Sequence, residues 1–378
     1  DRMEEVQKAV LSPEKARESI PKMLDLMQGH VISQAIYAVV QLGVPDVIGA
    51  GKVSVDIIAK RLEKSYPKLN KDSLARSLSM LSGVGLFEET YTVAFDGDRI
   101  AQYGLTDCSK LLQTGVPNQP SLASGAVHWM EPCLWGAWGK LFDYMSGALP
   151  ADCEPFKAHN KESVFQFYAK HPTSARHFNT FMSQFSALEI GLVTDMFDWG
   201  PFVKPGARVI DIGGSKGTLL AALKKKFPAL NCINFDLPEV TRHALEEDQK
   251  IQSGVEFAAG DMFESSTFPE NPTVFVMKHI LHDWSDEDSV KILKAMHKAS
   301  GPGVTLLMGE GVLPEPGDPA TPLTTSTKKV DVLMNLFKGK ERSRKNWEAI
   351  LKEGGWKLND IIATPAPVCQ LLVCSKST

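Results

Sequence analysis

The sequence lacks paired cysteines, a membrane-length apolar run and an excess of positive charge. Its 6 cysteines form no C-x-x-C pair and no Cys/His cluster with zinc spacing, which disfavours a disulfide framework and a structural zinc site. No stretch approaches the roughly 20 apolar residues of a membrane helix. The net charge of −4 gives no general attraction to nucleic acid or to anionic membranes. We therefore expect neither a nucleic acid nor a membrane as a partner.

The length and composition suit a globular protein of two domains. The 378 residues fit two domains of roughly 150 residues each, and a hydrophobic fraction of 43% allows a proper core. The charged N-terminal stretch has no signal-peptide core. With reduced cysteines, this predicts a reducing location in the cytoplasm or inside an organelle. Whether a targeting segment has been removed from the sequence stays an open question.

The N-terminal part reads as helical. Apolar residues recur at helical spacing within residues 21–48, and two short helices and a small β-wing follow, which is the winged-helix pattern. A winged helix often binds DNA. Here the second helix carries Asp72 beside Lys71 and Arg76, whereas phosphate contacts need a basic surface. We expect an interaction scaffold without nucleic acid.

Aromatic side chains are concentrated in residues 115–197. Most of them suit a hydrophobic core, but aromatic side chains also line small-molecule pockets. Trp129, Trp135 and Trp138 share one short segment, and we expect some of these rings to face a pocket.

After Pro205 the pattern changes to alternating strands and helices. Continuous apolar runs such as ARVIDIG, NCINFDL and TVFVMKHI predict a parallel sheet covered on both faces. Ligands of such a doubly wound α/β sheet bind beyond the carboxyl ends of its strands. The residues that follow these strands are therefore the candidates for chemistry.

The first three strand tips suit an adenosine cofactor. They carry, in order, Asp211, Gly213, Gly214, Asp236, Asp261 and Met262. Glycines let a ligand approach the backbone, and a helix N-terminus offers free N–H groups. Asp236 can accept hydrogen bonds from ribose hydroxyls. The turn also fits a dinucleotide, but an Asp that opens DIGGSKG, in place of G-x-G-x-x-G, favours S-adenosylmethionine over NAD.

The fourth strand leads to a candidate general base, His282. A histidine at the carboxyl end of a strand, beside the cofactor, can accept a proton near neutral pH. Glu310 ends the fifth strand and Glu341 lies in a later loop. Acidic residues behind a histidine hold its tautomer and stabilise the imidazolium. Ser285 and Asp283 also suit a helix cap, which would help to fix His282.

These motifs resemble the large O-methyltransferase family of the caffeic-acid and hydroxyindole type. The similarity runs nearly end to end and includes AVVQLGVPDVI, SVFQFYAKHP, FNTFMSQFS, DIGGSKG, FDLPEV, GDMF, KHILHDWSDED, MGEGVLPE and GKERS. The resemblance implies a winged-helix dimerisation domain before a Rossmann-like methyltransferase domain. We accordingly expect residues 1–190 to form the dimerisation and substrate-lid domain and residues 191–378 the catalytic domain of a homodimer.

The resemblance also implies roles for individual residues. For S-adenosylmethionine, the predicted contacts are Asp211, Gly213, Gly214, Asp236, Leu237, Asp261, Met262 and Lys278. For catalysis, His282 is the base and Glu310 and Glu341 are its partners. For the acceptor, the predicted contacts are Trp129, Trp135, Met182, Ser186, Asp283, Met334 and Asn335. No metal is expected, because the His282 machinery replaces the Mg²⁺ of catechol-type methyltransferases.

The sequence departs from the family pattern at three places. The segment HWMEPCLWGAWG is richer in tryptophan than phenolic substrates lead us to expect. Ser215 and Lys216 stand in a turn that commonly reads GGGxG, and Lys216 changes the charge near the cofactor. The loop before Glu341 has one glycine, Gly339, where the family usually has a pair. We therefore leave the placement of Glu341 to the structure.

Two reactions and one non-enzymatic function stay open at this point. Methylation of a phenol, whose pKa is near ~10, needs a base, which His282 would supply. Some members of the family instead S-methylate the thioether 4-methylthio-2-hydroxybutyrate in dimethylsulfoniopropionate synthesis. That reaction needs no base, and Trp129, Trp135 and Trp138 could stabilise its sulfonium product. A dimeric regulator that senses the cofactor would need a basic recognition helix, which the sequence lacks.

Overall fold

The computed structural model describes residues 9–117, 119–251, 253–366 and 368–377. Across these ranges no helix has both the length and the apolarity needed to cross a membrane. The chain packs into two compact units, one of Asp1–Trp135 with Thr173–Phe181, the other of Gly136–Pro172 with Met182–Thr378. The units interleave along the chain, and the boundary that we expect between residues 190 and 191 stays a prediction.

The first unit is mainly helical and includes a two-stranded hairpin. Its elements are α1 (Pro13–Met27), α2 (Gly29–Gln41), α3 (Val44–Ile48), α4 (Val55–Leu62), α5 (Lys71–Gly83), β1 (Phe87–Val93), β2 (Arg99–Leu105), α6 (Asp107–Lys110) and α7 (Ala123–Met130). Ser54 and Asn70 cap α4 and α5 by accepting backbone N–H groups, as good N-cap residues do. Ile58, Leu78 and Tyr103 are buried in the core that joins these helices to the hairpin. The predicted order of helix, helix and β-wing is confirmed.

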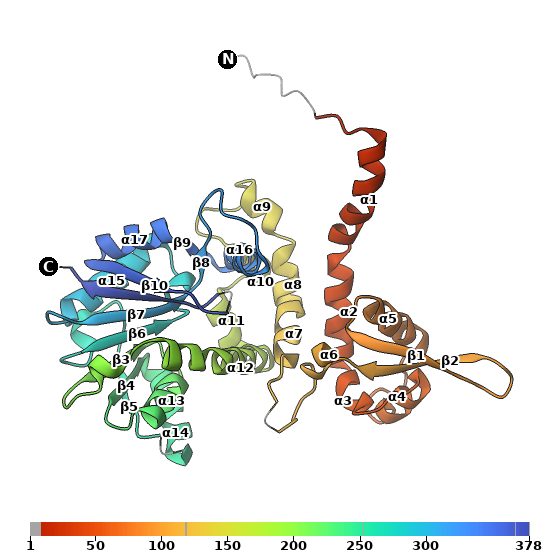
Figure 1. The fold of residues 1–378 in the computed structure, drawn as a ribbon, viewed down its shortest axis with the longest axis horizontal. Coiled ribbons are helices and arrows are strands. Elements are labelled where there is room, and N and C mark those ends of the chain that lie inside the picture. The colour runs from red at the N-terminus through yellow and green to blue at the C-terminus, as the bar shows by residue number, and fades with distance from the viewer. Residues whose placement is uncertain (1–8, 118, 252, 367, 378) are drawn as a thin grey trace. The chain divides into compact units, whose positions relative to one another are not determined.

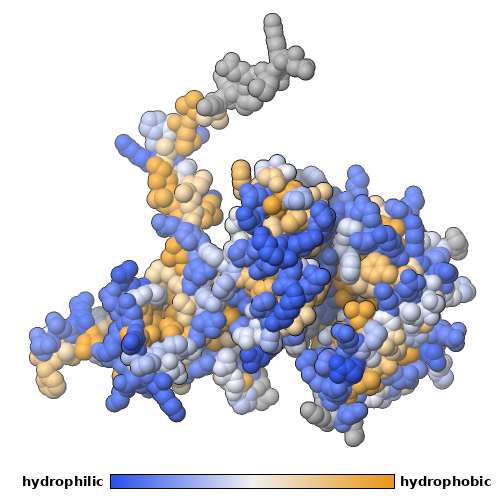
Figure 2. All heavy atoms as spheres, turned by 180° about the vertical axis from the view of Figure 1, so that it is seen from behind, coloured by the Kyte–Doolittle hydropathy of each residue, from blue (hydrophilic) through white to orange (hydrophobic). Residues whose placement is uncertain are grey.

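Helix α1 exposes its apolar residues. None of its residues is buried, and Ile20, Met23, Leu24 and Met27 are each about half or more exposed, between 47% and 65%. Figure 2 shows these hydrophobic side chains along the helix. An exposed apolar stripe of this kind marks an interaction surface.

The second unit is built on a seven-stranded sheet of order β10-β11-β7-β6-β3-β4-β5 (Figure 1). The strands are β3 (Arg208–Ile212), β4 (Asn231–Asp236), β5 (Glu256–Ala259), β6 (Val274–Lys278), β7 (Thr305–Glu310), β10 (Trp356–Ile362) and β11 (Gln370–Lys376). Strands β5, β4, β3, β6 and β7 are parallel to one another. Strand β11 is antiparallel to β7, and β10 is antiparallel to β11. The expected doubly wound sheet is confirmed, and β10 is a strand that the sequence analysis does not predict.

Helices cover both faces of this sheet. They include α13 (Thr218–Lys226), α14 (Pro238–Ile251), α15 (Asp286–Ala299) and α17 (Arg344–Glu353). The same unit also contains α16 (Pro322–Met334) and the shorter helices α9 (Leu141–Met145), α10 (Pro155–Asn160) and α11 (Val164–Lys170). Helices α8 (Pro132–Trp138) and α12 (Pro172–Met196) contribute residues to both units. Val209 of β3 packs with α12 and α13, whereas Ile210 packs with α15 and α17 on the other face. Successive side chains of β3 point to opposite faces of the sheet, and each face packs against an apolar layer. This explains the continuous apolar runs in the sequence.

The strand register brings the predicted residues to one edge of the sheet. Ile212 of β3 pairs with Phe235 of β4 and with Met277 of β6. The residues that come directly after these three are Gly213, Asp236 and Lys278. They therefore lie side by side at the ends of neighbouring strands. This is the edge where doubly wound sheets bind ligands.

Candidate active site

The glycine turn between β3 and α13 is too crowded for side chains. Gly213 has φ +71°, and a Cβ there would lie 2.5 Å from Cδ1 of Ile280. A Cβ on Gly214 would lie 2.1 Å from Oδ1 of Asn234. The Gly213 N–H donates to the Phe235 carbonyl at 2.8 Å. The turn therefore presents bare backbone at the strand ends, as a cradle for a nucleoside cofactor requires.

Asp236 is fixed by the backbone around it. Its Oδ2 accepts from the Ser215 N–H at 2.9 Å, and its Oδ1 accepts from the Leu237 N–H at 2.7 Å. Asn234 donates to the Ser215 carbonyl at 2.8 Å. Burial raises the pKa of Asp236, although these hydrogen bonds oppose the change. Each carboxylate oxygen still has acceptor capacity, so Asp236 can receive hydroxyl groups while it holds the turn.

Asp211 and Asp261 occupy different environments. Asp211 is buried below the glycine turn, and burial raises its pKa to about 7. Asp261 lies at the surface beyond β5, where its Oδ1 accepts from the Phe263 N–H at 2.9 Å. Met262 is partly buried and packs against the core on the α15 side. Asp261 and Met262 thus stand where an adenine ring could be bound, and Asp211 supports the turn from within.

Lys278 is held by two residues of α12. Its Nζ lies 3.1 Å from Oε2 of Glu189 and donates to Oγ of Ser186 at 3.0 Å. Glu189 is only 2% exposed. Burial would raise the pKa of Glu189, but His279 and Lys278 outweigh it and lower the pKa. Glu189 is not predicted from the sequence. Its only signal is a carboxylate between the apolar residues Leu188 and Ile190 of α12.

His282 is held by a buried carboxylate. Its Nδ1 lies 2.9 Å from Oε1 of Glu341, which is 3% exposed. Glu310 accepts instead from the backbone N–H groups of Ile280 and Leu281, at 3.0 and 2.9 Å. The structure thus brings both predicted acids to the turn that carries His282, one at the ring and one at the backbone.

The charges around His282 favour its protonated form. Burial lowers the pKa of His282, but Asp283, Glu341 and Glu310 outweigh burial and raise the pKa to about 10. The nearest oxygen of Asp283 is 3.6 Å from Nε2. Burial raises the pKa of Glu310 to about 7. These charges therefore favour the imidazolium form of His282 at neutral pH.

The loop that carries Glu341 is positioned with a single glycine. A Cβ on Gly339 would lie 2.4 Å from the His282 carbonyl oxygen, and the Lys340 N–H donates to that oxygen at 2.9 Å. The Glu341 N–H donates to Asp331 of α16 at 2.9 Å. Position 339 therefore has no space for a side chain.

Arg342 is a second residue that the sequence analysis misses. It is fully buried and donates to the Leu281 and Trp284 carbonyl oxygens, each at 2.8 Å. Its Nε also lies 2.8 Å from Oδ1 of Asp286. Because Arg342 follows Glu341 directly, these bonds tie the Glu341 loop to both ends of the turn that carries His282.

The predicted acceptor residues fall in both units. Met334 is buried, and Met182 and Asn335 are half-buried in the second unit. Trp129 and Trp135 belong to the first unit and are 42% and 38% exposed. Ser186 contacts Lys278, and Asp283 stands beside His282. Their roles toward an acceptor stay predictions.

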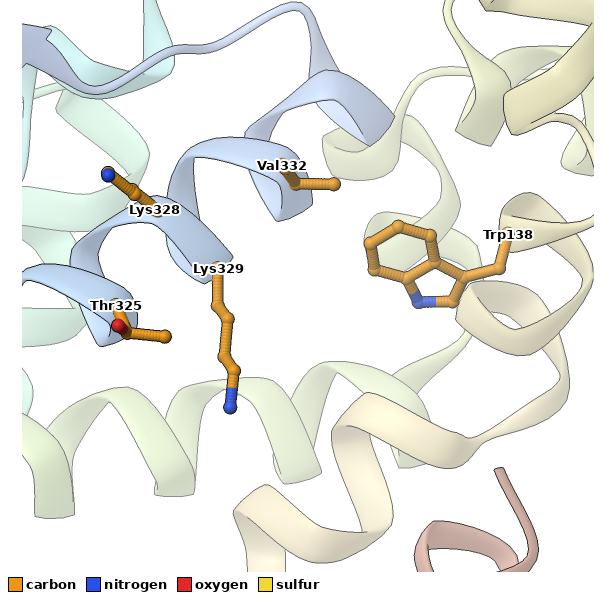
Figure 3. A pocket seen from close by; sticks show the side chains of 5 residues that line it. All are labelled: Trp138, Thr325, Lys328, Lys329 and Val332. Carbon is orange, nitrogen blue, oxygen red and sulfur yellow. The ribbon is translucent and has the colours of Figure 1, made fainter. Parts of the chain in front are cut away.

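A cavity of about 490 Å³ lies in the second unit, bordered by α16 and Trp138 (Figure 3). Its lining residues are Trp138, Thr325, Lys328, Lys329 and Val332. Figure 3 shows the Trp138 ring facing Val332 across the space. The same helix carries Asp331, which binds the Glu341 backbone. Helix α16 thus borders both this cavity and the loop of the candidate base.

Two groups of three metal-ligating side chains come close together in the described ranges. They are Glu189, His279 and Cys369, and His279, His282 and Glu310, with ligand atoms within 4.8 Å of one another in each group. Nε2 of His279 is already bonded to Oε2 of Glu189 at 2.8 Å. Burial raises the pKa of the Cys369 thiol, whereas a metal requires the thiolate. That the reaction needs no metal stays a prediction.

Comparison with known proteins agrees with this geometry. Residues 138–357 match the O-methyltransferase domain, and residues 24–115 match the O-methyltransferase dimerisation domain. The chain is 31% identical to the mitomycin biosynthesis 6-O-methyltransferase of Streptomyces lavendulae over 337 residues, 88% of each protein. The structure of the mitomycin 7-O-methyltransferase MmcR superposes with a TM-score of 0.79 at 28% identity, covering 96% of this chain and 99% of that one. Human N-acetylserotonin methyltransferase, solved with S-adenosylmethionine, shares the fold at 20% identity, with a TM-score of 0.77 over 98% of this chain and all (100%) of that one.

Proposed function

Because the chain belongs to the O-methyltransferase family, we propose that it methylates a phenolic or indolic hydroxyl with His282 as the general base. The methyl donor is S-adenosylmethionine, the acceptor is a small molecule, and the matched dimerisation domain indicates a homodimer. The observation that carries the proposal is the His282–Glu341 pair, 2.9 Å apart, at the cofactor edge of the sheet.

The cofactor edge fits S-adenosylmethionine. Gly213 and Gly214 present backbone and no side chain at the strand ends, because a Cβ would clash with Ile280 or Asn234, and bare backbone lets a ligand approach closely. Asp236 offers acceptors to ribose, and Met262 offers an apolar surface next to Asp261. When bound, the cofactor supplies an electrophilic methyl group on its sulfonium. The residues around it orient the donor and the acceptor and exclude water, which can contribute roughly 7–11 kcal/mol in favourable cases.

His282 is arranged to take a proton at Nε2. Glu341 engages Nδ1, so the neutral ring carries its proton there and presents the Nε2 lone pair. A phenol has a pKa near ~10, and a positioned base typically contributes about 10²–10⁴-fold in rate. Glu341 also stabilises the imidazolium that forms. The raised pKa of His282 makes it a strong base that is mostly protonated at neutral pH.

The thioether alternative receives no support from the comparisons reported above, which are with O-methyltransferases and with N-acetylserotonin methyltransferase. The test is a mass-spectrometric assay with S-adenosylmethionine and a panel of phenols, indoles and methylthio hydroxy acids. We expect a methylated hydroxyl. A sulfonium product from 4-methylthio-2-hydroxybutyrate alone would overturn the proposal. Binding of the cofactor with no product from any acceptor would favour the regulator.

We also propose that the enzyme works in a reducing compartment. None of the 6 cysteines, all of which lie in the described ranges, is in a disulfide, and Cys133, Cys232, Cys369 and Cys374 are buried. Burial raises the pKa of Cys133 to about 12 and that of Cys232 to about 11. These thiols are unreactive core residues. The test is thiol alkylation of the freshly isolated protein followed by mass spectrometry. We expect every cysteine to be alkylated as a thiol, and a native disulfide would contradict the proposal.

A further inference from the structure

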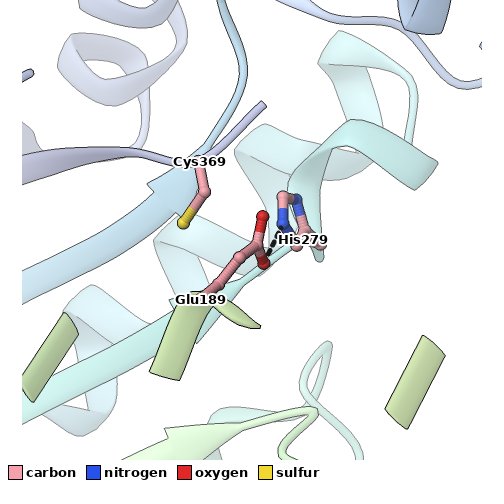
Figure 4. Close-up of side chains that lie close together, drawn as sticks. All are labelled: Glu189, His279 and Cys369. Carbon is pink, nitrogen blue, oxygen red and sulfur yellow. Dashed lines mark hydrogen bonds and ion pairs between the residues drawn. The ribbon is translucent and has the colours of Figure 1, made fainter. Parts of the chain in front are cut away.

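Glu189 uses only half of its carboxylate. Oε2 lies 2.8 Å from Nε2 of His279 and 3.1 Å from Nζ of Lys278. Oε1 is buried and has no hydrogen-bond partner within the described part of the chain. Figure 4 shows the carboxylate between the His279 ring and the Cys369 sulfur. A buried oxygen of an ionised group without a partner is rare in a native protein and calls for one that the chain does not supply.

Glu189 and Lys278 form an ion pair in which one carboxylate oxygen and one ammonium N–H have no partner among the described residues. The hydrogen bond and charges of His279 and Lys278 keep Glu189 ionised against its burial. Burial lowers the pKa of His279, although the hydrogen bond and the charge of Glu189 oppose this change. The Lys278 ammonium has three N–H donors, of which Glu189 and Ser186 engage two. The cluster therefore has one free anionic acceptor and one free cationic donor.

The cluster lies beside the cofactor turn. Met277 of β6 pairs with Ile212 of β3 in the sheet. The next residues, Lys278 and Gly213, are therefore neighbours at the ends of these two strands. The charge of Lys278 acts on Asp211 below the same turn. His279 adopts a left-handed backbone, φ +53°, and its N–H donates to the Gly309 carbonyl at 2.9 Å. The two unused positions thus lie at the same edge of the sheet as the glycine turn.

We propose that Glu189 binds the amino-acid end of S-adenosylmethionine. Its Oε1 accepts a hydrogen bond from the α-ammonium group, and Lys278 donates its remaining N–H to the α-carboxylate. The zwitterion of the methionine moiety carries the two charges that complement the cluster. The proposal rests on the cofactor and not on the methyl acceptor, because S-adenosylhomocysteine has the same amino-acid end and binds without an acceptor.

The test is isothermal titration of the full-length protein with three ligands. They are S-adenosylhomocysteine, its deaminated analogue that keeps the carboxylate, and 5′-methylthioadenosine, which lacks the whole amino-acid end. For Glu189→Gln we expect S-adenosylhomocysteine to bind about 10- to 100-fold more weakly, as for loss of a charged hydrogen bond. The deaminated analogue should bind the native protein and this variant equally well.

Two further variants separate binding from scaffolding. Lys278→Met should weaken S-adenosylhomocysteine and the deaminated analogue together and leave 5′-methylthioadenosine unchanged. Ser186→Ala, which removes a Lys278 partner but not Oε1, should change the preference for the amine little. Equal weakening of all three ligands in Glu189→Gln would show that Glu189 only supports the fold, and no weakening would show that Oε1 does not meet the amine.

The native protein provides a test that needs no variant. It must bind S-adenosylhomocysteine more tightly than the deaminated analogue, whatever the stability of Glu189→Gln. Equal affinities would overturn the proposal. If the native protein bound none of the three ligands, the cofactor assignment itself would fail, and that result is distinct from failure of the role of Glu189.

Discussion

His282 and Glu341 form a directed pair at the edge of the sheet, with Nδ1 of the ring 2.9 Å from Oε1 of the buried carboxylate. The pair joins a strand-end turn to a loop 59 residues further along the chain. The loop is fixed independently by Arg342, which bonds to the carbonyl oxygens of Leu281 and Trp284. The geometry of the base is therefore set by the backbone before any ligand binds.

The rate should rise with pH. The raised pKa of His282, about 10, means that the neutral base becomes more populated as pH increases toward that value. We expect kcat/KM to increase on the order of tenfold per pH unit from about pH 6 to pH 9. A bell-shaped profile centred on neutral pH would contradict this expectation.

Asp283→Asn should move that profile to lower pH. The charge of Asp283 is the first of the contributions that raise the pKa of His282, so its removal lowers the pKa and frees the base earlier. The pKa of the acceptor does not change, which separates this effect from ionisation of the substrate. The measurement is kcat/KM against pH for the native enzyme and for Asp283→Asn. Superimposable profiles would show that Asp283 does not raise the pKa of the catalytic base.

Glu341 and Glu310 should respond differently to substitution. Glu341→Gln keeps an acceptor for Nδ1 but removes the charge that stabilises the imidazolium, so kcat should fall about 10²-fold or more. Glu310→Ala leaves the N–H groups of Ile280 and Leu281 without their acceptor. Each such loss costs about 1–3 kcal/mol of stability. Urea unfolding should show a smaller loss for Glu310→Gln, and equal losses for both Glu310 variants would contradict this account.

Gly311→Ala should disable catalysis without loss of cofactor binding. A Cβ at Gly311 would lie 2.1 Å from Oε2 of Glu341, so the carboxylate must move away from His282. We expect a lower kcat with an unchanged dissociation constant for S-adenosylhomocysteine. Gly301→Ala is the matched control, because a Cβ there meets nothing within 4 Å. An unaffected kcat in Gly311→Ala would argue against the pair.

The apolar stripe of α1 should contribute to the dimer. Met23 is 57% exposed, and Met23→Lys would place a charge in an apolar interface. Asp25→Lys is the control, since two residues along a helix turn the side chain by about 200° to the other side. We expect light scattering to show weaker dimerisation for Met23→Lys alone. A native-like dimer in both variants would exclude this stripe from the interface.

The sequence predicts which residues lie at the ends of the strands. It does not predict which residues from distant parts of the chain contact them. Gly213 follows β3 directly, Asp236 ends β4, and His282 lies in the turn just after β6, so the sheet topology predicts that these residues are neighbours. Glu189 meets Lys278 from 89 residues earlier, and nothing local to α12 indicates that contact. Arg342 is likewise explained only by the carbonyl oxygens that surround it in the folded chain.

Strand β10 shows the same limit in the fold. Its sequence WKLNDII alternates weakly, and its register shifts between Leu358 and Asp360. It lies at the end of the sheet beside β11, with antiparallel pairing. An edge strand exposes one side to solvent and keeps polar residues, so it lacks the continuous apolar run by which the parallel strands are predicted.

The most direct test of the central claim is the single-turnover rate of His282→Ala with the acceptor that the native enzyme methylates, compared at saturating S-adenosylmethionine. We predict O-methyl product and a rate lower by about 10²–10⁴-fold, with S-adenosylhomocysteine binding unchanged by titration. A variant that keeps most of the native rate, with a sulfonium as product, would contradict general-base catalysis by His282.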